Sequence, residues 1–180
     1  MSIVTQKNIT AAGDVVAGNK NEYILPRPTQ LELFSKAYKD EVSLNQCTSQ
    51  ILDELTHYRS SKSDIRDLAT KLSEAGYDHI INEAEELKEN VAKLIIKNQH
   101  YKSAQKIITY LLSDIESIFN SKIKPKLIPN QPHHELNDIL RENVELVICE
   151  KLGENVLDIY NRQMKGMVYF LTGNCHLEWT

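Results

Sequence analysis

The chain has 180 residues, of which 41% are hydrophobic and 26% are charged, and these proportions are typical of one globular domain with its own core. Its formal net charge of -4 argues against a general affinity for nucleic acid or for anionic membranes, because both need clustered positive charge. The cysteines are widely spaced, no basic leader precedes an apolar stretch, and no apolar run approaches the ~20 residues that span a bilayer. These features predict a cytoplasmic protein that does not contact a membrane.

Residues 1–28 differ in composition from the rest of the chain. They contain Gly13 and Gly18, each followed by Asp or Asn, together with Pro26, Pro28 and short β-prone runs. Each Gly-Asp or Gly-Asn pair suits a tight turn. We interpret residues 1–28 as an extended arm that forms a β-hairpin or a strand swapped between protomers, and a leader without fixed structure is the alternative.

Residues 29–180 show the apolar spacing of helices. Thr29 and Glu32 have the spacing of a capping box, and Gly76 and Gly153 stand where helices are expected to stop. The stripe in residues 104–119 is the widest, which predicts a central helix, and three prolines in residues 121–134 predict a loop. Further stripes lie in residues 31–38, 44–60, 63–76, 80–95, 136–148 and 156–168.

Residues 174–179 alternate between polar and apolar side chains and end in Trp179. This pattern predicts a short strand, which must pair with the arm of this chain or with the sheet edge of another protein. The predicted fold is therefore mainly α: a multi-helix bundle over residues 29–180, with an extended N-terminal arm and a short C-terminal strand.

Two clusters could carry chemistry. His133 and His134, with Glu135 or Asp138, are the residues that a metal-dependent hydrolase or nuclease would use, and this function stays open as an alternative. Adjacent histidines at a helix start point in different directions, and HExxH spacing is absent, so a polar first turn is the simpler interpretation. We expect no metal, no cofactor and no catalytic residue.

Lys122, Lys124 and Lys126 form the second cluster, a small basic patch. A small regulator that binds nucleic acid through these lysines is a further alternative. The run lacks arginine and interleaved aromatic residues, so it is more typical of a solvated loop, and we do not expect direct binding of nucleic acid.

Two segments resemble parts of known proteins. Residues 8–20 (NITAAGDVVAGNK) are similar to a Gly-Asp-rich arm that precedes helical domains in several bacterial conflict-system proteins. Residues 166–179 (GMVYFLTGNCHLEW) resemble the closing motif of the C-terminal domain found in ABC-three-component systems, which overlap with the Lamassu-type anti-phage and anti-plasmid systems. Between these segments, the helices are similar to the family in length and character only.

The resemblance implies partners. Such systems combine an SMC- or Rad50-like ABC ATPase, a small middle component and a protein that carries an effector. Because only a short arm precedes the helices here, we expect a non-catalytic adaptor that docks an effector onto the ATPase and that can form a homo-oligomer. Tyr169, Phe170, His176 and Trp179 are the expected partner-contact or anchoring residues, and sealing of the core is the alternative, since aromatic side chains bury well.

Overall fold

Helices make up all the regular secondary structure in residues 27–60 and 66–180, which are the residues that the computed structural model describes. The mainly α class is therefore confirmed, whereas the predicted arm falls almost entirely on residues 1–26, outside the described residues. The helices are α1 (Gln30–Ser43), α2 (Asp53–Arg59), α3 (Leu68–Glu74), η1 (Asp78–Ile80), α4 (Ile81–Asn98), α5 (Lys102–Ile118), η2 (Phe119–Ile123), η3 (Lys124–Lys126), α6 (His133–Leu140), η4 (Arg141–Glu145), α7 (Leu146–Leu152) and α8 (Asn161–Gly173).

The helix start predicted at Thr29 and the helix stops predicted at Gly76 and Gly153 are present in the structure. At the start of α1, the Thr29 backbone N–H donates to Glu32 Oε2 at 2.6 Å, and the Glu32 N–H donates to Thr29 Oγ1 at 3.2 Å. This reciprocal pair is the predicted capping box, and it satisfies two N–H groups that a helix start leaves unpaired. Gly76 (φ 80°) ends α3 and Gly153 (φ 57°) ends α7, both with a positive φ that glycine adopts without steric cost.

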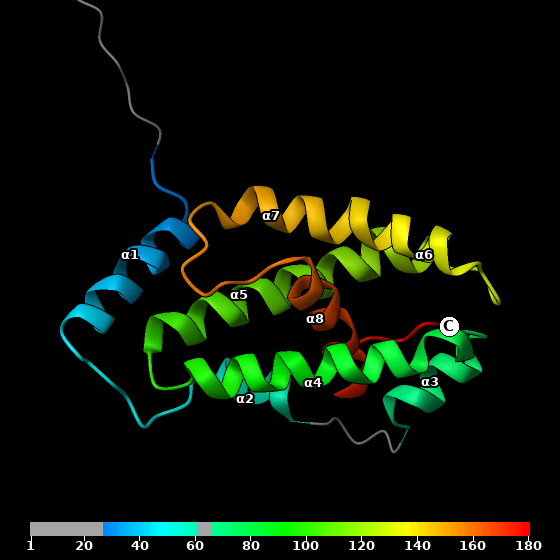
Figure 1. Ribbon diagram of the computed structural model, residues 1–180, viewed down its shortest axis with the longest axis horizontal. Coiled ribbons are helices and arrows are strands. Elements are labelled where there is room, and N and C mark those ends of the chain that lie inside the picture. The colour runs from blue at the N-terminus through cyan, green and yellow to red at the C-terminus, as the bar shows by residue number, and fades with distance from the viewer. Residues whose placement is uncertain (1–26, 61–65) are drawn as a thin grey trace, which may run out of the picture.

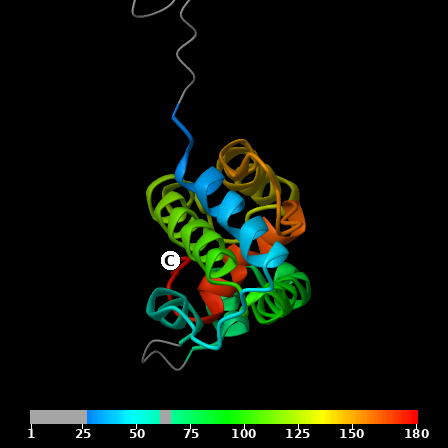
Figure 2. The same cartoon turned by 90° about the vertical axis from the view of Figure 1, so that its left-hand side faces the viewer.

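The core has two central helices. The predicted one, α5, runs along the molecule in Figure 1 and packs against α1, α2, α4 and α8. The other is α8, in which every residue from Met164 to Thr172 is buried. Figure 2 shows α8 in the interior, with α4 on one side and α5 on another. A helix that is buried all round needs an apolar sequence all round, and residues 166–171 provide one.

Helices α4 and α8 cross closely at Gly166. A Cβ atom at Gly166 would lie 2.6 Å from the Leu87 backbone oxygen and 2.9 Å from Val91 Cγ2. No side chain fits at these distances, so glycine is required here for the approach of two backbones. The crossing therefore positions α8, and with it the start of the segment that follows α8, against α4.

The prediction of a short strand at residues 174–179 is wrong. A Schellman turn ends α8: the His176 N–H donates to the Leu171 oxygen at 2.8 Å, and the Cys175 N–H donates to the Thr172 oxygen at 3.1 Å. Cys175 takes the left-handed conformation, with φ 62°. The chain then runs extended across the core, and no strand lies beside it among the described residues, so its alternating side chains pack without a ladder.

Three helix boundaries also differ from the expectation. Residues 44–52 are not helical, because α1 ends in a similar turn at Asn45 (φ 50°). The predicted loop at residues 121–134 is shorter, since a π turn (η2) and a 3-10 turn (η3) extend α5 as far as Lys126. The last helix begins at Asn161 and not near residue 156, after Asp158 adopts a φ of 55°.

Candidate functional site

The four residues that the sequence singled out gather at the C-terminal end of the fold, and all are buried. Tyr169 is 0% exposed, Phe170 5%, His176 7% and Trp179 4%. Tyr169 and Phe170 project from the buried helix α8, whereas His176 and Trp179 belong to the extended segment that follows it. Because they are buried, these four side chains contribute first of all to the packing of the closing motif.

Trp179 packs in a cluster of aromatic rings. Its ring centroid lies 5.2 Å from that of Tyr77, 5.4 Å from that of Phe119 and 6.1 Å from that of Tyr169, which is stacked parallel to it. The indole Nε1–H donates to Thr172 Oγ1 at 2.9 Å, so its polar group is satisfied inside the core. This cluster joins the end of the chain to η2, η1 and α8.

The last residues are also held by polar contacts that sequence reasoning missed. Glu178 Oε1 lies 2.8 Å from the Nζ of Lys71, whose side chain is 1% exposed, and Glu178 Oε2 lies 3.3 Å from Arg66. The Asn174 side chain donates to the Tyr58 backbone oxygen at 3.0 Å. Because these partners are more than a hundred residues apart in the sequence, no local pattern could reveal them.

His176, in the closing motif, packs against α2. Its ring centroid is 4.9 Å from that of His57 and 5.0 Å from that of Tyr58. These ring contacts tie α2, which precedes the central helices, to the end of the chain.

The histidines of the alternative hydrolase do not assemble into a metal centre. His133 and His134 are exposed at the start of α6, and His133 Nε2 lies 3.1 Å from Glu83 Oε2. Glu83 Oε1 also accepts a hydrogen bond of 2.8 Å from Lys165, whose Nζ lies 2.7 Å from the Asn137 amide oxygen. Within residues 27–60 and 66–180, no three His, Cys, Asp or Glu side chains are placed so that they could hold a metal ion.

This polar cluster instead joins α4, α6 and α8. Burial alone would raise the pKa of Glu83, but the hydrogen bond and charge of Lys165, assisted by His133, hold that pKa below its ordinary value. Tyr169 lies nearby, and burial, reinforced by the charges of Glu83 and Glu145, raises the pKa of its hydroxyl far above the usual range. The Tyr169 phenol is therefore neutral at all physiological pH values.

The basic patch is distributed over the turn that follows α5. Lys122 and Lys126 are exposed, and Lys124 is half-buried. Lys126 Nζ approaches the Asn143 amide oxygen at 3.4 Å, which ties η3 to the π turn η4. The three lysines do not lie on one continuous helical face, since a proline at position 125 and the change from π to 3-10 geometry separate them.

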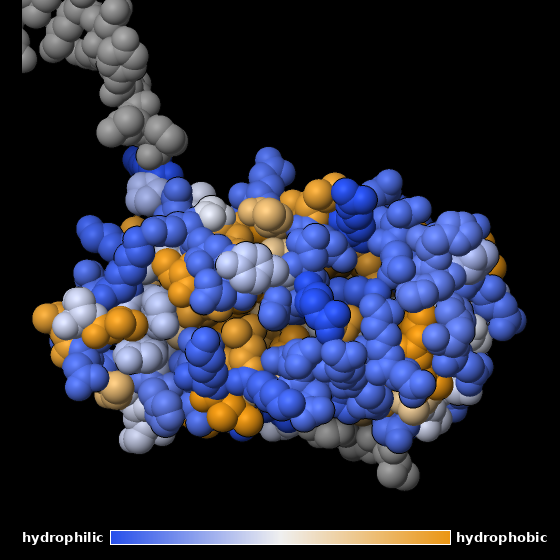
Figure 3. All heavy atoms as spheres, viewed as in Figure 1, coloured by the Kyte–Doolittle hydropathy of each residue, from blue (hydrophilic) through white to orange (hydrophobic). Residues whose placement is uncertain are grey.

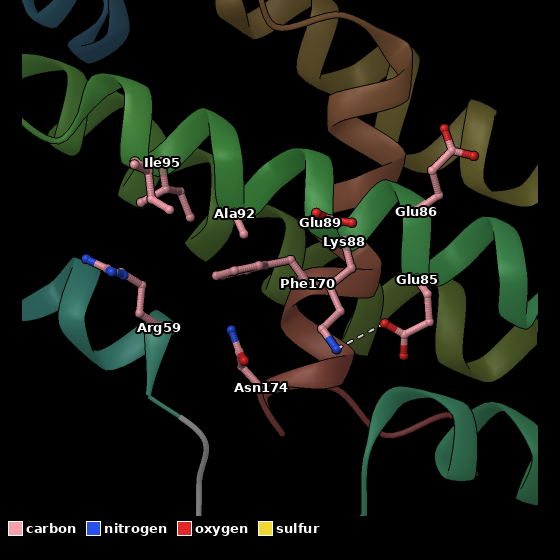
Figure 4. A pocket seen from close by; sticks show the side chains of 10 residues that line it. Arg59, Glu85, Glu86, Lys88, Glu89, Ala92, Ile95, Phe170 and Asn174 are labelled. Carbon is pink, nitrogen blue, oxygen red and sulfur yellow. Dashed lines mark hydrogen bonds and ion pairs between the residues drawn. The ribbon is translucent and has the colours of Figure 1, made fainter.

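A groove of 530 Å³ lies between the end of α2 and the outer side of α4. Figure 4 shows the Phe170 ring pointing into it beneath Ala92, with Arg59 at one end and Glu85 and Glu86 at the other. Ile96, 54% exposed, adds a large apolar side chain to its wall. On the face of the molecule in Figure 3, polar and charged side chains predominate, with apolar side chains gathered in separate patches. Apolar side chains line the middle of the groove and charged side chains stand at its ends, and Phe170, which is 5% exposed, is the predicted site residue in its lining.

Comparisons with known proteins identify one family. Residues 67–179 match the model of C-terminal domain 9 of the ABC-three component (ABC-3C) systems. No curated protein and no solved structure matches the chain. None of the described helices combines the length and the apolarity needed to cross a membrane. The matched segment runs from the N-cap of α3 to Trp179, and it includes the closing motif, the α4–α8 crossing and the α4 and α8 sides of the groove. Because this match covers most of the chain, the chain belongs to the C-terminal domain 9 family of the ABC-three component systems.

Proposed function

We propose that the protein is a non-catalytic interaction subunit of a bacterial anti-phage or anti-plasmid defence system. Its role is to dock an effector protein onto an SMC- or Rad50-like ABC ATPase in a Lamassu-like assembly. The observation that carries the proposal is the family match, because it places the chain in a system of several components.

The structure supports a binding role in two ways. The closing motif packs into the core, and two polar side chains of this region form internal pairs, Lys165 with Glu83 and Trp179 with Thr172. The molecule also presents an apolar groove with charged ends, which is the usual form of a surface that binds another protein.

The proposal is tested by recovery of the tagged full-length chain from its native host, with the accompanying proteins identified by mass spectrometry. We expect an ABC ATPase and an effector-bearing protein to be recovered together with the chain in stoichiometric amounts. Recovery of the chain alone, as a homogeneous oligomer, would contradict the proposal and would direct attention to a search for enzymatic activity.

A further inference from the structure

We propose that the groove between α2 and α4 binds a short amphipathic helix from another component of the same system. The helix presents apolar side chains spaced by one turn to Phe170 and Ile96. It carries basic residues where it meets Glu85, Glu86 and Glu89, and a carboxylate at the end that meets Arg59. This inference rests on the proposed function, since it supplies the surface through which that function operates.

The first reason is the pattern of α4. Its inward stripe, Ala84, Leu87, Val91 and Ile95, is buried against the core, as in any amphipathic surface helix. Ile96 lies outside that stripe and is 54% exposed. Together with Ala92, one turn earlier, and the Phe170 ring of α8, it forms the apolar part of the groove lining. An exposed apolar side chain beside an apolar groove with a charged border is typical of an interaction surface.

The second reason is the shape of the groove. From Glu85 to Ile96 the α4 axis advances about 17 Å at about 1.5 Å per residue, which is the length of about three helical turns. The groove encloses 530 Å³ between α4 and α2, with α8 as its floor. An elongated groove between helices accepts an amphipathic helix through apolar side chains at positions i, i+3 or i+4, and i+7.

The third reason is the charge along the groove. Glu85 and Glu86 stand at the end that lies nearer the start of α4, Glu89 stands between that end and Ala92, and Arg59 stands beside Ile95 at the opposite end. Lys88 lies among the carboxylates and its Nζ is 3.3 Å from Glu85 Oε2.

The carboxylates already have surface partners, but these pairs are weak. Glu86 pairs with Arg162 at 2.6 Å, and Glu89 with Lys93 at 2.9 Å, and each of the four side chains is about two-thirds exposed. Exposed pairs of this kind contribute little and exchange readily for a partner that also buries apolar surface. Complementary charge on the bound helix therefore fixes its direction in the groove.

The test compares two glutamate substitutions at side chains of equal exposure. Ile96 is 54% exposed in the groove, and Leu146 is 55% exposed on α7, outside it. The tagged full-length wild type, Ile96→Glu and Leu146→Glu are each produced together with the other components of the system. We expect Ile96→Glu to lower recovery of one identified component at least about tenfold, as for a central interface residue, and Leu146→Glu to leave it unchanged. Both variants must keep the helical circular dichroism of the wild type, which is expected because both side chains face solvent.

A photoreactive benzoyl-phenylalanine at position 96 identifies what lies in the groove. We expect a crosslink to a helix of another component whose residues near the crosslink carry net positive charge at one end. If Ile96→Glu recovers the other component as well as the wild type does, or if the crosslink falls on an acidic segment, the groove assignment is overturned while the proposed function stands. A crosslink to a second copy of this chain would overturn it in favour of self-association. If the wild type recovers no other component, the proposed function fails and this inference fails with it.

Discussion

The crossing of α4 and α8 makes a prediction that a single methyl group can test. In Gly166→Ala, the new Cβ would lie 2.6 Å from the Leu87 backbone oxygen, an atom that cannot rotate aside. Overpacking of a core costs about 1–3 kcal/mol, and the rigid backbone contact places this change at the upper end, near 3 kcal/mol. Alanine returns about 1 kcal/mol of helix propensity. The net loss of unfolding free energy is therefore about 2 kcal/mol, or about 4–8 °C in Tm for a domain of this size.

Gly173 provides the matched control, because it lies on the same helix and the same change can be made there. A Cβ at Gly173 would meet the Cε of Lys88 at 2.9 Å, and that flexible side chain can move away. We expect Gly173→Ala to melt within about 2 °C of the wild type.

The assay is thermal and urea unfolding of the full chain, followed by circular dichroism at 222 nm. A Gly166→Ala variant that melts with the wild type would show that α4 and α8 do not approach as closely as described. Equal destabilisation by both variants would show that the effect is a property of glycine in α8 and not of the crossing.

Two further predictions concern the closing motif and the polar cluster. Trp179→Ala should lower the unfolding free energy by about 3–5 kcal/mol in urea titrations, because it removes a buried ring. Trp179→Phe should lower it much less. An unchanged urea midpoint for the alanine variant, together with lost partner binding, would instead make Trp179 a contact residue. Glu83 has a depressed pKa in the folded protein, so its contribution to stability is present above its ordinary pKa, near 4.5, and is lost as the pH falls through the folded value. Urea midpoints measured from pH 7 down to pH 3 should therefore fall less steeply for Glu83→Gln than for the wild type, and parallel curves would contradict the pairing with Lys165.

The closing motif and the groove have different roles in the structure. Within the matched segment, the closing motif packs into the core: Trp179 fills the aromatic cluster and Glu178 pairs with Lys71. Residues that mark a family can therefore be those that build its scaffold, while the recognition that we propose uses the exposed side chain of Ile96. Substitutions in the motif and in the groove should accordingly separate loss of folding from loss of binding.

The sequence by itself determined the helical class, several helix ends and the closing motif. These features depend on interactions within one or two turns: the Thr29–Glu32 capping box, the positive φ of Gly76, and apolar stripes at helical spacing. The identity of the motif residues also came from the sequence, through their resemblance to the family, and their burial was the alternative that the sequence left open.

The tertiary structure alone decided the path of the last residues, the role of Gly166 and the existence of the groove. Alternating side chains in residues 174–179 suit either a strand or an extended segment packed on a core, and only the presence of a neighbouring strand could distinguish them. Gly166 matters because Leu87, far away in the sequence, presents its carbonyl oxygen at that point. The groove likewise combines Arg59 of α2 with Ile96 of α4 and Phe170 of α8. A local pattern cannot encode such contacts, because they arise only when separate helices pack together.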